Sequence, residues 1–208
     1  MDALGLLKDV KLVPVLVIDD ADTAVDLAKS LQDAGIGALE ITLRTPAALP
    51  AIESIANAVE DIVLGAGSIR RPAQLATVKN AGARFAVSPG STGLLLETAT
   101  ELNMPFVPGA VTPSEMLALF EQGYVLQKFF PAELSGGAPL LKAVSAPMPE
   151  IRFFPTGGIN ASSVSSYSQL PNVISIGGSW FASGELIAEK RFAEITKNAQ
   201  DALSACNN

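Results

Sequence analysis

The chain has 208 residues, of which 49% are hydrophobic and 17% charged, so it can bury a large core and is not a disordered segment. Its formal net charge is -7, with no histidine and a single cysteine. These properties argue against nucleic-acid binding, exclude an internal disulfide and remove the commonest zinc ligand.

Apolar runs rich in β-forming residues recur along the chain, 20 to 27 residues apart. They cover residues 12–18, 38–42, 62–66, 84–88, 105–108, 125–130, 152–156 and 173–176. The first run is too short to span a bilayer and is flanked wrongly for a signal peptide, so we expect a cytoplasmic protein without membrane contact.

Helical periodicity fills the intervals between these runs. The first two predicted helices have apolar faces made of Ala24, Leu27, Ala28 and Leu31, and of Ile52, Ile55, Ala56 and Val59. Proline is predicted at three helix starts, Pro46, Pro72 and Pro113, and glycine just past three helix ends, Gly35, Gly82 and Gly123. Thr112 and Glu115 have the spacing of a capping box.

Eight strand-helix units without a linker favour a single-domain (β/α)₈ barrel over residues 1–208, with a doubly wound open sheet as the alternative. The motif Gly65-Ala66-Gly67 lacks the third glycine and the acidic residue of a dinucleotide fingerprint, so no nicotinamide site is expected. A barrel places its active site at the carboxyl ends of its strands. Polar residues at those ends are therefore the candidates.

Lys128 lies inside the apolar run 125–130, where an amine is costly to keep charged. A neutral amine can attack a ketone or aldehyde and form a Schiff base. The alternative is a lysine whose stem lies along apolar surface while its head reaches water. Phe130, on the same strand face, could form an apolar wall over an imine or simply pack in the core.

Glu40 is predicted to point into the barrel, because strand alternation places it on one face with Thr42. A buried carboxylate requires a partner or a proton-transfer role. Arg44 is the nearest such partner in sequence, and it could instead hold a substrate carboxylate with its planar fork. Ser68, at another strand end, could donate a hydrogen bond to the same carboxylate.

Glycine pairs accompany the last two runs. Gly157 and Gly158 follow Thr156 at the end of the seventh run, and Gly178 precedes Ser179 after the eighth. Loops after strands seven and eight of a barrel commonly bind phosphate through backbone N–H groups. The alternative is a pair of tight turns. We expect Ser179 to donate a hydroxyl and Thr156 to line the pocket.

Several ordered motifs resemble the bacterial 2-keto-3-deoxy-6-phosphogluconate (KDPG) aldolases over nearly the whole chain. They are Leu39-Glu40-Ile41-Thr42-Leu43-Arg44-Thr45, Gly65-Ala66-Gly67-Ser68, Ser88-Pro89-Gly90, Lys128-Phe129-Phe130-Pro131-Ala132-Glu133, Phe154-Pro155-Thr156-Gly157-Gly158-Ile159 and Gly177-Gly178-Ser179-Trp180. The resemblance implies a class I aldolase of the Entner-Doudoroff pathway, built as a barrel, usually a homotrimer, and working without a metal or other cofactor. Many members also cleave 4-hydroxy-2-oxoglutarate (KHG).

The resemblance also implies residue roles. Lys128 matches the Schiff-base lysine and Glu40 the proton-transferring carboxylate. The pyruvyl carboxylate site matches Arg44 and Ser68, and the phosphate site matches Gly157, Gly158, Gly178 and Ser179.

The chain departs from the family pattern at two positions. Ser68 stands where threonine is usual, which keeps the hydroxyl, and Val17 stands where many members have arginine near the phosphate. The sequence therefore does not determine which aldehyde the protein prefers. Two other functions fit the same residues: a phosphate-binding barrel isomerase or synthase in which Lys128 acts only electrostatically, and a sugar-phosphate sensor.

Overall fold

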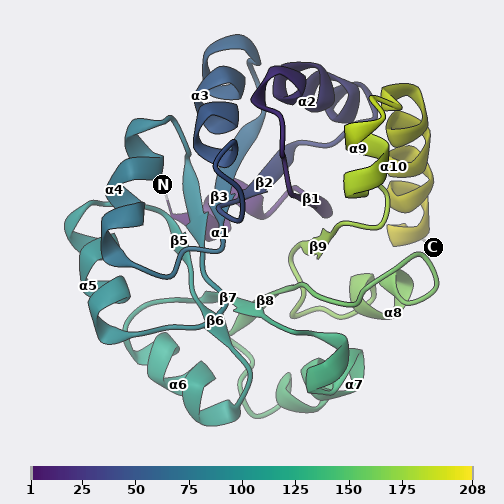
Figure 1. The fold of residues 1–208 in the computed structure, drawn as a ribbon. Coiled ribbons are helices and arrows are strands. Elements are labelled where there is room, and N and C mark those ends of the chain that lie inside the picture. The colour runs from purple at the N-terminus through teal and green to yellow at the C-terminus, as the bar shows by residue number, and fades with distance from the viewer. Residues whose placement is uncertain (1, 208) are drawn as a thin grey trace.

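The computed structural model describes residues 2–207, and it places parallel strands at the centre of a ring of helices (Figure 1). The strands are β1 (Leu12–Leu16), β2 (Ala38–Thr42), β3 (Val63–Gly67), β4 (Phe85–Val87), β5 (Phe106–Val107), β6 (Gly109–Ala110), β7 (Leu126–Phe129), β8 (Arg152–Pro155) and β9 (Ile176–Gly178). Each of the eight predicted apolar runs contains or overlaps a strand.

Helices alternate with the strands along the chain. They are α1 (Ala3–Leu7), α2 (Ala24–Asp33), α3 (Ala48–Ala58), α4 (Pro72–Asn80), α5 (Gly93–Glu101), α6 (Pro113–Glu121), α7 (Gly137–Val144), α8 (Val164–Ser168), α9 (Gly184–Ala188) and α10 (Phe192–Cys206), with short 3₁₀ helices η1 (Ala21–Thr23) and η2 (Glu133–Ser135). Within residues 2–207, none of these helices combines the length and the apolar character needed to cross a bilayer.

The strands close into a barrel. One sheet has the order β5-β4-β3-β2-β1-β9 and a second has the order β6-β7-β8, with all paired strands parallel. A parallel bridge between Thr156 and Gly177 joins the end of β8 to β9. Because β1 pairs with both β2 and the last strand, the doubly wound open sheet is wrong and the (β/α)₈ barrel is confirmed.

Three boundaries differ from the sequence-based expectation. The run 105–108 forms two short strands, β5 paired with β4 and β6 paired with β7, on either side of Pro108, which has no N–H to donate. The last strand lies at Ile176–Gly178 rather than at 173–176, because its glycines belong to the ladder with β1. Helix α3 begins at Ala48, two residues after Pro46.

Most of the predicted helix signals are confirmed. The α2 face of Ala24, Leu27, Ala28 and Leu31 is buried, and α4 and α6 begin at Pro72 and Pro113. Thr112 caps α6: its hydroxyl accepts from the Glu115 N–H at 3.3 Å, and the Glu115 carboxylate accepts from the Thr112 N–H at 2.8 Å. In α3, Ile52 and Ile55 are buried as predicted, whereas Ala56 is exposed; Val59 is buried but lies just past the end of the helix. The three glycines at helix ends, Gly35, Gly82 and Gly123, all have positive φ.

Apolar side chains close one end of the barrel interior. Ala3 and Leu7 of α1 belong to one apolar cluster with residues from seven positions of the strands, which are Val13, Ala38, Phe85, Val87, Val107, Leu126 and Phe154. A larger apolar layer lies between the strands and the outer helices, and both Leu39 and Ile41 belong to it. Four buried polar side chains, Glu40, Thr42, Lys128 and Thr156, come from the middle or the carboxyl ends of β2, β7 and β8.

Candidate active site

Lys128 and Glu40 meet inside the barrel, although they are 88 positions apart in the chain. The Lys128 Nζ donates to the Glu40 Oε1 at 3.3 Å, and the two side chains are 6% and 0% exposed. Lys128 therefore does not reach water with its head, which was the alternative interpretation. Among residues 2–207 the ion-pair partner of Glu40 is this lysine, so the alternative in which Glu40 pairs with Arg44 is wrong.

Glycines on neighbouring strands make room for this pair. Glu40 lies beside Gly65 in the β2-β3 ladder, and Lys128 lies beside Gly109 in the β6-β7 ladder. A Cβ on Gly67 would stand 1.9 Å from the Glu40 Oε1, so the carboxylate occupies the space of a missing side chain. The Phe85 ring fills the equivalent space at Gly65. Glycine inside a strand often marks such a close approach.

Two buried oxygen atoms in this region have no hydrogen-bond partner in the described part of the chain. They are the Glu40 Oε2 and the Thr156 Oγ1. Buried polar atoms are nearly always paired, and leaving one unpaired costs about 1–3 kcal/mol. The Lys128 to Glu40 contact is also longer than the 2.7–2.9 Å of a tight charge-assisted bond. Both features leave bonding capacity for a bound molecule.

A cavity of about 590 Å³ opens at the carboxyl ends of β1, β8 and β9. The predicted site residues that line it are Arg44, Phe130, Thr156, Gly157, Gly158, Gly178 and Ser179. Lys128 and Glu40 are not part of its lining and lie deeper in the barrel. The Lys128 Nζ stands 5.3 Å from the centroid of the Phe130 ring, and Phe130 is outside both apolar clusters, so it forms a wall between the lysine and the cavity.

Arg44 and Ser68 lie together at the ends of β2 and β3. The Arg44 Nε donates to the Ser68 Oγ at 3.3 Å, and Arg44 is exposed toward solvent. Ser68 has a φ of 61°, a left-handed conformation that costs a non-glycine residue of order 1–3 kcal/mol and is typical of functional sites. Ser68 does not itself line the cavity, so any contact with a ligand there depends on Arg44.

The glycine turn after β8 faces the cavity from the side of Phe130. Gly157 and Gly158 have φ values of 103° and 82°, and a Cβ on Gly157 would stand 3.1 Å from the Phe130 ring. Arg44 is the one charged side chain among the lining residues, and Val17 contributes only an apolar surface. An anion in this part of the cavity would therefore be held mainly by backbone N–H groups and the Ser179 hydroxyl.

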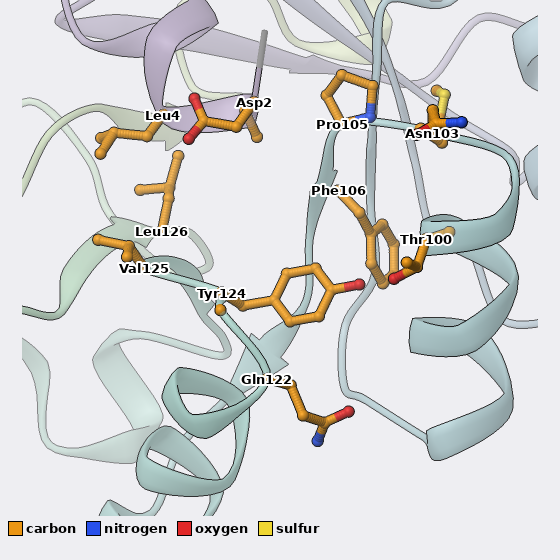
Figure 2. A pocket seen from close by; sticks show the side chains of 14 residues that line it. Asp2, Leu4, Thr100, Asn103, Pro105, Phe106, Gln122, Tyr124, Val125 and Leu126 are labelled. Carbon is orange, nitrogen blue, oxygen red and sulfur yellow. The ribbon is translucent and has the colours of Figure 1, made fainter.

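A second pocket of about 380 Å³ lies at the opposite end of the barrel (Figure 2). The side chains of Phe106 and Tyr124 lie next to each other at its centre, with ring centroids 6.2 Å apart, and Asp2, Asn103 and Gln122 surround them. It contains none of the predicted site residues. Within residues 2–207 no three histidine, cysteine, aspartate or glutamate side chains are grouped as metal ligands in either place.

Sequence reasoning missed the residues that shape the site without reacting. Gly67 makes room for Glu40, and Gly177 makes room for Thr156, because a Cβ on Gly177 would stand 2.3 Å from the Thr156 Oγ1. A Cβ on Gly178 would meet the Trp180 ring at 1.9 Å, so this glycine is required by packing as well as by its place in the cavity. The sequence signal that could have identified these residues is glycine inside a predicted strand, which often marks a close approach of another group.

The fold and the site define a barrel lyase of the aldolase class. The family model described as KDPG and KHG aldolase matches residues 4–198. The chain is 45% identical over 192 residues to a 2-dehydro-3-deoxy-phosphogluconate aldolase of Pseudoalteromonas atlantica, covering 92% of this chain and 89% of that protein. It is 43% identical to the KHG/KDPG aldolase of Escherichia coli, covering 92% and 90%. The chain belongs to the KDPG and KHG aldolase family.

A solved structure supports the same assignment. The KDPG aldolase of Legionella pneumophila, which holds pyruvate as a covalent carbinolamine intermediate, matches with a TM-score of 0.93 and 40% identity. The match covers 96% of this chain and 97% of that one.

Gly67→Ala is predicted to displace the Glu40 carboxylate from Lys128, because the new methyl group would overlap the Glu40 Oε1. Misplacing a reacting group by about 1 Å can reduce turnover roughly 10²-fold. The measurement is kcat for pyruvate release, with Gly93→Ala as the matched control, since a Cβ there meets nothing within 4 Å. Wild-type turnover in Gly67→Ala would contradict the role given to this glycine.

Proposed function

We propose that this protein cleaves KDPG to pyruvate and glyceraldehyde 3-phosphate, and KHG to pyruvate and glyoxylate, through a Schiff base on Lys128. The observation that carries the proposal is the buried contact of 3.3 Å between Lys128 and Glu40, below a cavity at the carboxyl end of the barrel. The names of the relatives support the two substrates.

The proposed reaction begins when the neutral amine of Lys128 attacks the C2 ketone and forms a carbinolamine. Glu40, directly or through a water molecule, moves the protons that let water leave and the imine form. Its Oε2, which lacks a partner in the described structure, is the acceptor available for this transfer.

Cleavage then uses the protonated imine as the electron sink. Glu40 takes the proton from the C4 hydroxyl, the C3–C4 bond breaks, and the aldehyde leaves. The electron pair of that bond becomes the enamine, which is protonated at C3 and hydrolysed to pyruvate and free amine. No metal or other cofactor enters this sequence.

Substrate binding is proposed to divide between two ends of the cavity. Arg44 lines the cavity and holds the pyruvyl carboxylate, and Ser68, which lies next to the cavity and accepts from the Arg44 Nε, supports Arg44 in this role. The phosphate is held by the N–H groups of Gly157, Gly158 and Gly178 and by the hydroxyl of Ser179, while Thr156 and Phe130 line the middle of the cavity. We also propose that residues 1–208 act as one domain, in the cytoplasm, within the Entner-Doudoroff pathway.

Borohydride reduction in the presence of pyruvate is predicted to attach a permanent adduct to Lys128, because reduction traps the imine. The reaction is run with EDTA, since the mechanism uses no metal, and the labelled peptide is identified by mass spectrometry. Lys79, which is exposed in the last turn of α4 and does not line the cavity, serves as the internal control for nonspecific modification. A label on another lysine refutes the assignment, and failure to trap any adduct would favour a barrel isomerase or sensor.

Glu40→Gln is predicted to lower kcat by roughly 10² to 10⁴ while the protein stays folded, the usual size of a general acid-base contribution. Glutamine keeps an acceptor for the Lys128 amine but cannot take up a proton. The measurement is pyruvate release in a coupled lactate dehydrogenase assay, with circular dichroism to verify the fold. Full activity of the variant would make Glu40 a structural residue.

We further propose a homotrimer, as the resemblance implies. Three large apolar side chains are exposed on consecutive units of the barrel: Leu94 (62%) on α5, Leu117 (47%) on α6 and Leu134 (89%) on η2. We propose that these three side chains lie at contacts between subunits, where apolar surface is buried on assembly. Size-exclusion chromatography with light scattering should give the mass of three chains, and the mass of one chain would contradict the proposal.

A further inference from the structure

Glu133 supports the glycine turn from the side that faces away from the cavity. Its N–H donates to the Gly157 carbonyl at 3.1 Å, and the N–H of the preceding Ala132 donates to the Thr156 carbonyl at 2.9 Å. A Cβ on Gly158 would meet the Cβ and Cγ of Glu133 at 2.8 and 2.9 Å. Gly157 and Gly158 line the cavity, whereas Glu133 does not. The backbone and stem of Glu133 are therefore packed directly behind the turn.

Tyr167 fixes the carboxylate of Glu133. Its ring is fully buried in α8, its hydroxyl donates to the Glu133 Oε1, and the Ala138 N–H donates to that hydroxyl. Burial, with the Glu133 carboxylate second, raises the pKa of Tyr167 well above its ordinary value, so the hydroxyl remains a donor. The bond joins η2, the start of α7 and α8, which are the segments that flank the turn.

Glu133 places a negative charge directly behind the turn that is proposed to bind phosphate. A carboxylate beside a site for an anion opposes binding, so a free Glu133 side chain that turned toward Gly158 would weaken phosphate binding. The bond from Tyr167 holds the carboxylate on the far side of the turn and holds the turn itself in the shape seen here. Neither residue touches Lys128 or Glu40 in any hydrogen bond or ion pair of residues 2–207.

We infer that the Glu133–Tyr167 hydrogen bond positions the glycine turn for phosphate and thereby sets the preference for phosphorylated over unphosphorylated substrates. Both are positioning residues, because they act through Gly157 and Gly158 rather than on the reacting atoms. This inference rests on the proposed function and adds the hydrogen bond that makes the protein prefer KDPG to KHG.

Tyr167→Phe tests the inference, because it removes one hydroxyl and keeps the buried ring. We expect KM for KDPG to rise about fivefold, the size of one lost hydrogen bond, with kcat for KDPG and KM for KHG within about twofold of wild type. A merely structural defect would change both substrates alike. The matched control is Tyr124→Phe, which removes the hydroxyl bonded to the Leu96 carbonyl at 3.2 Å, near the pocket at the opposite end, and should change neither KM.

Two substitutions of Glu133 separate position from charge. Glu133→Gln keeps an oxygen that accepts from Tyr167 and removes the negative charge, so KM for KDPG should stay at or below the wild-type value. Glu133→Ala removes the acceptor and should raise KM for KDPG as Tyr167→Phe does. If both variants instead lower this KM equally, Glu133 acts only as a repulsive charge and the inference is wrong.

The remaining outcomes are distinguishable from a failure of the proposed function. Wild-type KM values in Tyr167→Phe, with wild-type enzyme still preferring KDPG, would overturn this inference alone. If the wild-type enzyme shows no preference for KDPG, the proposed phosphate site is wrong, and this inference is wrong with it. Absence of pyruvate release and of borohydride trapping would instead overturn the proposed reaction.

Discussion

An amine and a carboxylate lie in contact in the water-poor interior of the barrel. Moving each ion out of water costs several kcal/mol, and a single contact of 3.3 Å between Lys128 and Glu40 does not satisfy all their bonding capacity. The Glu40 Oε2 has no partner in the described structure, and neither does the Thr156 Oγ1 nearby. Such a pair contributes little to the stability of the fold, but its unpaired atoms can bind a third polar group.

The contact depends on the absence of side chains around it. Gly67 leaves the space that the Glu40 carboxylate occupies, and Gly65 leaves the space for the Phe85 ring below it. The interior is therefore built in two layers, an apolar one next to α1 and a polar one toward the carboxyl ends of the strands. Glycine costs strand stability, and this barrel places Gly67 where a Cβ would displace the Glu40 carboxylate from Lys128.

Local sequence patterns predicted the helices and strands well. They could not predict which side chains from distant strands meet inside the barrel. The periodicity and the proline and glycine signals located α2, α4 and α6, because each depends on neighbours within a few residues. The sequence offered Arg44 as the nearest partner for Glu40 and could not identify Lys128 as the actual one, since only barrel closure brings β7 opposite β2. Gln127 of β7 makes a further contact that these patterns could not predict: its amide donates to the Met116 and Tyr124 carbonyls at 2.9 and 3.0 Å and so joins β7 to α6.

Apolar side chains close the amino-terminal end of the barrel. Ala3 and Leu7 of α1 pack against the interior there, and the cavity opens at the other end. The Lys128 amine does not line this cavity, whereas the glycine turn does. In the reaction proposed above, the aldehyde leaves while the three-carbon fragment is still bound to Lys128. With that chemistry, the fold implies that the aldehyde is released before pyruvate and that pyruvate binds first in the reverse direction.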